Sequence, residues 1–205
     1  MSSSPDPFAF LAGPPEQLAP ELLGAVLRHG PVAVRLTEVE AYGGSHDPGS
    51  HAYRGPTRRN ASMYADAGTL YCYLSHGIHV CANVVVGPVG EPGALLLRAG
   101  RVVTGSDAVE QRRPGVVEGS WARGPGNLGR SLGLGLEHDG TDLRTGPVRL
   151  ELPSTSSVAA HPVTWTSGPR VGLRSASDRP WRFMTVDDPS VSAYRRHPKA
   201  DGRDR

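Results

Sequence analysis

No stretch of the sequence is apolar enough to cross a membrane. A membrane-spanning helix needs about eighteen or more consecutive apolar residues, and the 205-residue chain has no such run. Its first residues, MSSSPDPFAFLAG, also lack the basic start and long apolar core of a signal peptide. Cysteine is scarce: with two cysteines and no secretion signal, we expect free thiols in a reducing compartment.

The chain also lacks the spacing patterns of common metal and nucleophile sites. There is no CxxC pair, no phosphate-binding GxxxxGKS and no GxSxG. Several histidines and an aspartate could still suggest a metal-dependent hydrolase: His46, Asp47, His51, His76 and His79. They fall in a glycine-rich loop and a hairpin rather than on one helix face, so we expect no metal and treat that interpretation as remote.

Lysine is nearly absent. Lys199 is the only lysine among 22 basic residues, and residues 51–130 hold nine arginines against five acidic residues, a balance of +4 in a chain of net charge +2. Arginine binds phosphate through two parallel hydrogen bonds, but a GC-rich genome produces the same bias. The charge pattern therefore permits a nucleic-acid partner without establishing one.

Apolar periodicity and turn signals predict a single domain of mixed α/β class with a largely antiparallel sheet and flanking helices. We expect the domain to span residues 14–197, between disordered tails at 1–13 and 198–205. Helices are predicted over 14–30, 106–113 and 124–134, and strands over 31–42, 93–103, 146–153 and 169–174.

The strand predicted over residues 31–42 ends in carboxylates. Side chains two residues apart share a face of a strand, so its apolar face also carries Glu38, Glu40 and Tyr42. A carboxylate on a core face is costly unless its desolvation is compensated. Two interpretations stay open: a solvated strand end with ion pairs to arginines, or a site where a carboxylate deprotonates a water.

The segment GTLYCYLSHGIHVCANVVV predicts a protruding β-hairpin with a two-residue turn at His76 and Gly77. That turn would place Cys72 opposite Cys81 and put Tyr71 and Tyr73 on one face. The tyrosines are either core-edge residues or a stacking wall for a planar base. In the second case the hairpin tip would project as a wedge.

These segments, in this order, resemble the alkyladenine (3-methyladenine) DNA glycosylase family. The resemblance lies in TEVEAYGGSHDPGSHAYRGPTRRNASMY, GTLYCYLSHGIHVCANVV and GALLLRAG, and more weakly in RGPGNLGRSLGL and GPRVGLRSASDRPWRF. Together these segments cover most of residues 20–195. The Glu-x-Glu-Ala-Tyr run with its spaced histidine, and the tyrosine-rich hairpin, are the most specific features.

The resemblance implies a role for individual residues. Glu40 would be the catalytic glutamate that activates water, and His76 would be the wedge that enters the minor groove. The pocket for the flipped base would be formed by Tyr42, His51, Tyr73 and Asn83, where Asn83 crowds out the exocyclic amine of guanine. Further residues would lie near the site or contact DNA: Arg54, Arg59, Arg98 and Asn127.

Four positions depart from the family pattern. His76 replaces the usual tyrosine at the hairpin tip, Asn127 replaces a lysine, and Gly129 and Arg130 replace a cysteine and a glutamine. An imidazole is smaller and more polar than a phenol ring, so it would fill the gap left by an extruded base less well.

The resemblance implies a monofunctional glycosylase that flips 3-methyladenine, or another alkylated or deaminated purine, out of duplex DNA and hydrolyses its N-glycosidic bond. The alternative is a non-catalytic binder of damaged DNA. We expect no cofactor, a monomer, and a cytoplasmic, nucleoid-associated location if the source is prokaryotic. Because no lysine lies near the site, we expect no strand-cleaving lyase step.

Overall fold

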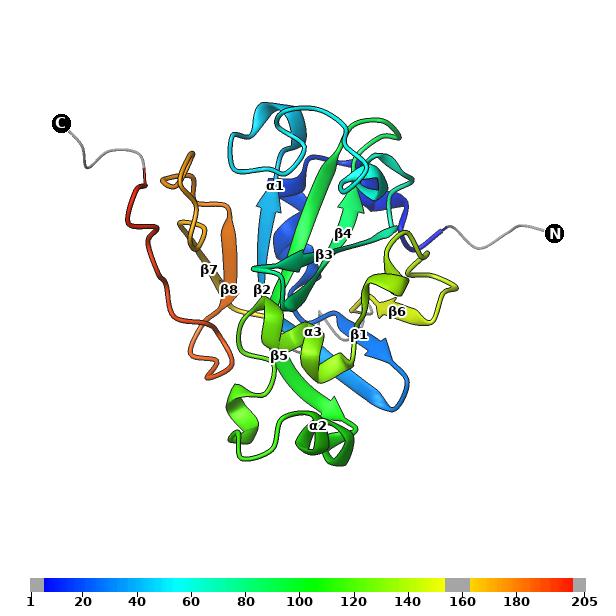
Figure 1. The fold of residues 1–205 in the computed structure, drawn as a ribbon, viewed down its shortest axis with the longest axis vertical. Coiled ribbons are helices and arrows are strands. Elements are labelled where there is room, and N and C mark those ends of the chain that lie inside the picture. Colours follow the sequence, from blue (N-terminus) through cyan, green and yellow to red (C-terminus); the bar gives the residue numbers. More distant parts are fainter. Residues whose placement is uncertain (1–5, 154–162, 201–205) are drawn as a thin grey trace.

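The computed structural model describes residues 6–153 and 163–200 (Figure 1). Its paired strands are all antiparallel and form one eight-stranded sheet with few short helices, which confirms the mixed α/β class. The strands are β1 (Val26–His29), β2 (Val32–Tyr42), β3 (Leu70–Ser75), β4 (His79–Val86), β5 (Gly93–Thr104), β6 (Val148–Glu151), β7 (Trp165–Gly168) and β8 (Arg182–Thr185). The α-helices are α1 (Pro15–Leu18), α2 (Ser106–Arg112) and α3 (Pro125–Leu132).

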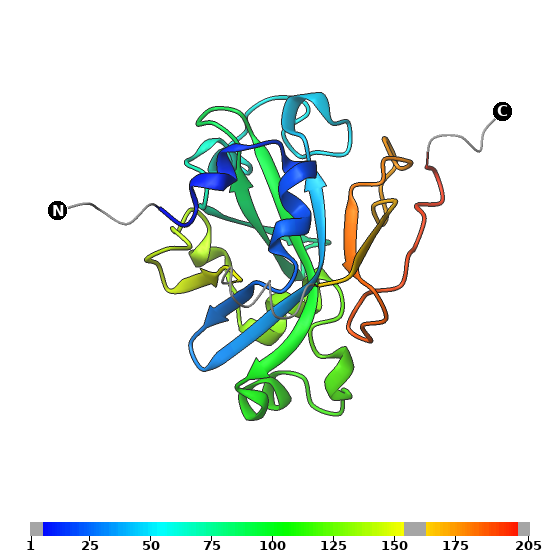
Figure 2. The same ribbon diagram turned by 180° about the vertical axis from the view of Figure 1, so that it is seen from behind.

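Short 3-10 helices make up the remaining helical structure of the described residues. They are η1 (Ala9–Ala12), η2 (Ala19–Leu22), η3 (Gly44–His46), η4 (Ala61–Tyr64), η5 (Glu118–Ser120) and η6 (Leu136–His138). In Figures 1 and 2, α3 lies on one face of the sheet and α1 with η2 on the other. None of the described helices has the length and apolarity that a membrane span requires.

Strand β2 lies at the centre of the sheet, whose order is β3-β4-β5-β2-β1-β6. One edge of β2 pairs with β5 along most of its length. The other edge pairs with β1 over its first half and with β8 at Glu38, Val39 and Glu40. The two glutamates therefore lie inside the sheet, between strands on both sides, rather than at an open strand end.

The amino-terminal region differs from the prediction. Residues 9–12 form η1, whose Leu11 is fully buried, so the expected disordered tail over 1–13 is wrong for this part; residues 1–5 lie outside the described range. The helix predicted over 14–30 stops within two turns. Gly24 then takes a positive φ of 87° and the chain turns into β1. Antiparallel pairing with β2 and β6 overrides the helical spacing of the leucines.

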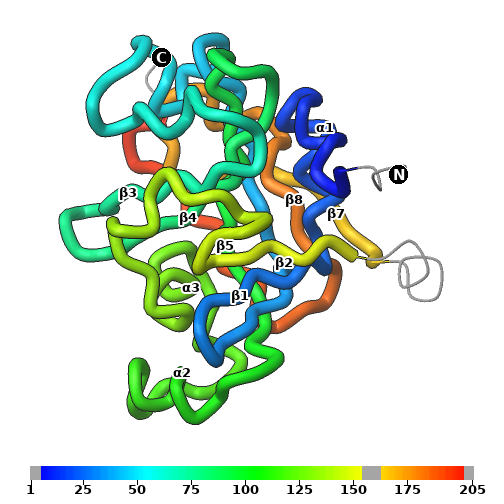
Figure 3. The backbone as a smooth tube through the Cα atoms, turned by 90° about the vertical axis from the view of Figure 1, so that its right-hand side faces the viewer, coloured from blue at the N-terminus to red at the C-terminus, as the bar shows by residue number. Residues whose placement is uncertain are grey.

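The hairpin β3–β4 exists, but its register differs from the prediction. Ser75 pairs with His79, so the turn has three residues, with φ values of 51° at His76 and 72° at Gly77. Tyr73, not Cys72, therefore faces Cys81 across the hairpin, and the predicted Cys72–Cys81 pairing is wrong. Both cysteines are free and buried. Figure 3 shows the turn projecting at the edge of the molecule.

The strands near the carboxyl terminus also differ from the prediction. Residues 169–174, predicted as a strand, form turns, whereas β7 and β8 lie on either side of them. The predicted helices at 106–113 and 124–134 correspond to α2 and α3. Of the predicted tail at 198–205, residues 201–205 lie outside the described range.

Candidate active site

One row of cross-strand partners runs across five strands and brings the site residues together. In order, the row contains Tyr71 on β3, Asn83 on β4, Leu96 on β5, Glu40 on β2 and Arg182 on β8. Direct cross-strand partners project their side chains on the same face of a sheet. The nearest row on one side pairs Tyr73 with Cys81. The antiparallel register therefore gathers residues that are far apart in the sequence.

The pairing between β2 and β5 is irregular at Arg98. The register runs from Glu38–Ala99 to Val39–Leu97, so Arg98 is the extra residue of a β-bulge. Bulges bend a strand and redirect side chains, and they are frequent beside active sites. Arg98 follows Leu96 by two residues, so the two side chains share a face of the strand, and both line the same pocket.

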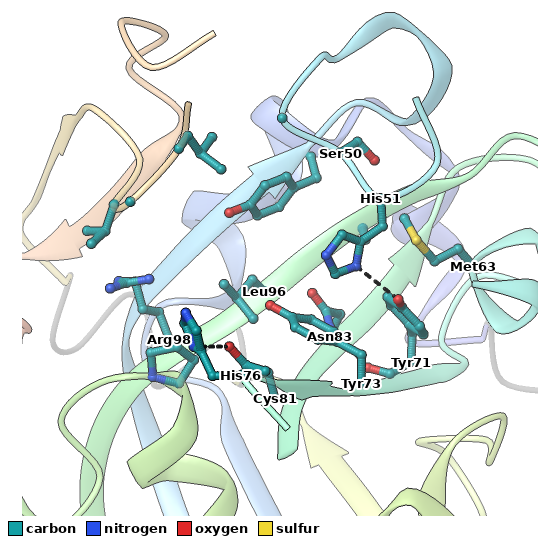
Figure 4. Close-up of a pocket in the computed structure, with 18 residues that line it drawn as sticks. Ser50, His51, Met63, Tyr71, Tyr73, His76, Cys81, Asn83, Leu96 and Arg98 are labelled. Atoms are coloured by element: carbon teal, nitrogen blue, oxygen red, sulfur yellow. Dashed lines mark hydrogen bonds between the residues drawn. The ribbon is translucent and has the colours of Figure 1, made fainter. Parts of the chain in front are cut away.

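A cavity of about 340 Å³ opens on this face of the sheet (Figure 4). That volume lies within the range of about 300–1,000 Å³ that is usual for small-molecule sites. Of the ten residues singled out from the sequence, six line it: Tyr42, His51, Tyr73, His76, Asn83 and Arg98. Glu40 is not a lining residue; it lies fully buried behind the wall.

Aromatic rings form one wall of the cavity. His51 packs edge-on against Tyr73, with ring centroids 4.5 Å apart, and its Nδ1 lies 3.0 Å from the Tyr71 hydroxyl. Figure 4 shows His51, Tyr73 and Asn83 directed toward the same space. Burial, together with the charge of Arg59, lowers the pKa of His51, which favours the neutral ring. Burial raises the pKa of Tyr71 to about 12.

The loop that carries His51 is held by Asn60. The Asn60 side-chain amide donates to the carbonyl oxygen of His51 at 3.0 Å and to that of Gly55 at 3.2 Å. Asn83 is fixed in a similar way, because its Nδ2 donates to the Tyr71 carbonyl at 3.0 Å. The polar residues of the pocket are therefore held in place before any ligand binds.

Glu40 contacts the pocket wall at three points. Its carboxylate accepts hydrogen bonds from the Tyr42 hydroxyl at 2.9 Å and from the backbone N–H of Val171 at 2.7 Å, and Arg98 Nη1 lies 3.5 Å away. All three partners line the cavity. Burial and the neighbouring Glu40 charge raise the pKa of Tyr42 well above its usual value, so the hydroxyl remains a donor.

Glu38, the second carboxylate of the strand, belongs to a buried ion-pair cluster. Its oxygens lie 2.9 Å from Arg98 Nε and 2.6 Å from Arg182 Nε, and they accept hydrogen bonds from Ser192. Two glutamates and two arginines thus balance one another. Burial alone would lower the pKa of Arg98, but Glu40 and Glu38 outweigh it and raise that pKa, which keeps the guanidinium charged.

A second buried ion pair lies beneath Tyr42. Arg170 and Asp47 are both fully buried, and Arg170 Nη2 donates to Asp47 at 2.8 Å. The Arg170 guanidinium stacks on the Tyr42 ring at 4.7 Å and on the Trp181 ring at 5.2 Å. Although burial opposes it, hydrogen bonding to Arg170 lowers the pKa of Asp47. The pair therefore holds the Tyr42 ring in place through the stacked guanidinium of Arg170.

Of the remaining predicted residues, His76 lines the pocket from the hairpin tip, whereas Arg54, Arg59 and Asn127 do not line it. His76 is exposed at the hairpin tip, where the neighbouring Ile78 is 72% exposed. Arg54 and Arg59 are exposed on the His51 loop, and Arg59 donates to the Leu74 carbonyl at 3.0 Å. Asn127 lies on α3 and accepts a hydrogen bond from Arg113. It does not line the cavity.

The described residues offer no candidate metal centre. Within residues 6–153 and 163–200, no group of three or more His, Cys, Asp or Glu side chains could hold a metal ion. His46 and Asp47 belong to the segment that follows β2 in the chain. Asp47 forms an ion pair with Arg170, and His79 lies on β4.

Sequence reasoning missed several residues of the site. Arg170 lies within the predicted strand 169–174 and Arg182 outside every predicted element, and Val171 contributes through its backbone, which leaves no side-chain signal. Ser192, which binds the Glu38 cluster, lies in a segment for which the sequence predicts no helix or strand. A buried carboxylate needs a charged partner, and this need is the signal that could have indicated the arginines.

A fully buried carboxylate thus lies behind an aromatic pocket, and comparison with known proteins gives the class of this chain. The methylpurine-DNA glycosylase family matches residues 9–189. A relative from Nocardia farcinica is 52% identical, covering 92% of this chain and 91% of its own; another from Leifsonia xyli subsp. xyli is 49% identical, covering 95% and 94%. Both carry the name 3-methyladenine DNA glycosylase.

The chain therefore belongs to the methylpurine-DNA glycosylase family, which confirms the resemblance seen in the sequence. It is a DNA glycosylase, a hydrolase that cleaves N-glycosyl bonds, and its substrate is DNA.

Proposed function

We propose that this enzyme flips 3-methyladenine out of duplex DNA and cleaves its N-glycosidic bond with a water that Glu40 activates. The observation that carries the proposal is the position of Glu40, a fully buried carboxylate whose three hydrogen-bonding partners all line the cavity. A carboxylate fixed in this way can accept a proton from water and stabilise a cationic transition state.

Hydrolysis replaces the N-glycosidic bond with a bond from the anomeric carbon to the water oxygen. Glu40 takes a proton from water, the water oxygen bonds to the anomeric carbon, and the N-glycosidic electron pair leaves with the base. The transition state resembles an oxocarbenium ion, as in other glycoside hydrolyses. A methylated purine is already cationic and departs as a neutral base, so it needs little protonation. The same site could accept 7-methylguanine in the same way, whereas neutral hypoxanthine or ethenoadenine would also have to be protonated, by a group other than Glu40, before the base departs.

The pocket offers the contacts that a flipped base requires. Extrusion costs a few kcal/mol, and the cost is lowest for a damaged base. Stacking on Tyr42 and Tyr73 would return about 1–3 kcal/mol for each base–aromatic contact. Asn83 would crowd out the exocyclic amine of normal guanine. His76, with the exposed Ile78 beside it, would enter the minor groove as the wedge.

The proposal is tested with defined duplexes, each carrying one lesion. The purified enzyme, acting as a monomer, should release the free base from a methylated duplex, with or without a chelator. The DNA strand should stay intact until alkaline heating, because Lys199, the one lysine of the sequence, does not line the cavity and so offers no amine for a lyase step. Binding of the lesion without base release would instead favour the non-catalytic binder, and loss of activity in chelator would favour a metal-dependent hydrolase.

A further inference from the structure

The carboxyl-terminal segment of residues 188–195 contacts the back of the site. It lies almost wholly beyond the family match, which ends at residue 189. Ser190 anchors the segment, because its hydroxyl lies 2.7 Å from the Thr37 hydroxyl and also donates to Asp188 at 2.8 Å. Asp188 in turn pairs with Arg101 at 3.1 Å.

Ser192 connects this segment to the buried charges. Its hydroxyl accepts a hydrogen bond from Arg98 Nε at 3.2 Å and donates to Glu38 at 2.9 Å. Its backbone N–H donates to the other Glu38 oxygen at 2.7 Å, and its carbonyl accepts from Arg182 at 2.5 Å. One serine therefore contacts three of the four buried charged side chains.

A second contact of the segment lies beside the group that binds the other Glu40 oxygen, the one that Arg98 does not contact. The backbone N–H of Gly172 donates to the Arg195 carbonyl at 2.9 Å. Gly172 follows Val171, whose own N–H donates to Glu40. The segment thus adjoins two of the three groups that contact the Glu40 carboxylate.

We propose that Ser192 is a positioning residue that holds the Arg98 guanidinium toward Glu40. The inference rests on the proposed role of Glu40. Arg98 has two carboxylates within reach: Glu38 at 2.9 Å from Nε and Glu40 at 3.5 Å from Nη1. The Glu40 contact is the longer one, so it is the first to be lost if the guanidinium turns. The Ser192 hydroxyl fixes the direction of Nε–H, and with it the plane of the whole fork.

The test compares three variants under single-turnover conditions with enzyme saturating a lesion duplex. Ser192→Ala removes the hydroxyl but keeps the backbone contacts, and should slow base release about 10- to 100-fold, the effect of misplacing a catalytic group by about 1 Å. Ser192→Thr keeps a hydroxyl and should stay within about threefold of wild type. Ser190→Ala is the matched control, because Ser190 anchors the same segment without touching Arg98 or Glu38.

Affinity for an abasic-site duplex should be unchanged in all three variants, which separates positioning from DNA binding. If Ser192→Ala melts below the assay temperature, Ser192→Cys replaces it, with nearly the same volume and a weak hydrogen bond. Base release at the wild-type rate by Ser192→Ala would overturn the inference. So would a loss of rate in Ser190→Ala or in Ser192→Thr that equals the loss in Ser192→Ala. A Glu40→Gln enzyme with wild-type activity would overturn the proposed function instead.

Discussion

The buried Asp47–Arg170 pair should dominate the stability of the pocket. Arg170→Met removes the cation but leaves Asp47 fully buried, with only two backbone N–H donors at 3.1 Å and Arg179 at 3.7 Å. Removing one partner of a buried ion pair costs about 3–5 kcal/mol. With a urea m-value of about 2 kcal/mol/M, the unfolding midpoint should fall by about 1.5–2.5 M.

The matched control is Arg179→Met. Arg179 also approaches Asp47, but its side chain is 34% exposed, so its loss should cost less than about 1 kcal/mol. The double variant Asp47→Asn with Arg170→Met removes both charges and should recover at least about half of the lost stability. Urea denaturation at pH 7 measures all of these. A cost below about 1 kcal/mol for Arg170→Met, or no recovery in the double variant, would refute the reasoning.

Three further predictions follow from named contacts. Burial and Arg59 lower the pKa of His51, so its NMR titration midpoint should lie below the usual value of about 6.5, and Arg59→Gln should raise it; a midpoint at or above 6.5 in wild type would contradict this. Thiol titration of the freshly unfolded protein should count both cysteines, Cys72 and Cys81, whereas a count of zero would reveal a disulfide. Gly129→Ala places a Cβ 2.1 Å from the Val80 carbonyl oxygen, so it should destabilise the fold by about 1–3 kcal/mol; unchanged stability in urea would mean that α3 packs less closely.

The strands that build the pocket floor could be predicted because their signal is local. Alternating and β-branched residues mark β2, β3, β4 and β5, and each was expected close to its observed place. The apolar face of β2 likewise led to Glu40 and Tyr42. Most of the pocket residues could be predicted because they lie on these strands or on the loop between them.

The features that could not be predicted depend on long-range pairing. The leucines near residue 22 have helical spacing, but β1 forms because β2 and β6 offer it partners. Strand β8 is only four residues long, and it forms through its pairing with β2 and β7. The hairpin register depends on whether the turn has two or three residues, and the turn length could not be predicted from His76, Gly77 and Ile78. Ser192 acts through contacts more than 90 residues away in the sequence.

The role of Glu40 is tested most directly by the single-turnover rate of base release in the Glu40→Gln variant. Glutamine keeps the shape: its amide oxygen can accept from the Val171 N–H and its NH2 can donate to the Tyr42 hydroxyl, but it cannot take a proton from water. The account predicts a loss of at least about 100-fold in rate, with unchanged affinity for an abasic-site duplex. The control Glu137→Gln, at a side chain that is 74% exposed, should behave as wild type. Base release by Glu40→Gln at the wild-type rate would contradict the account.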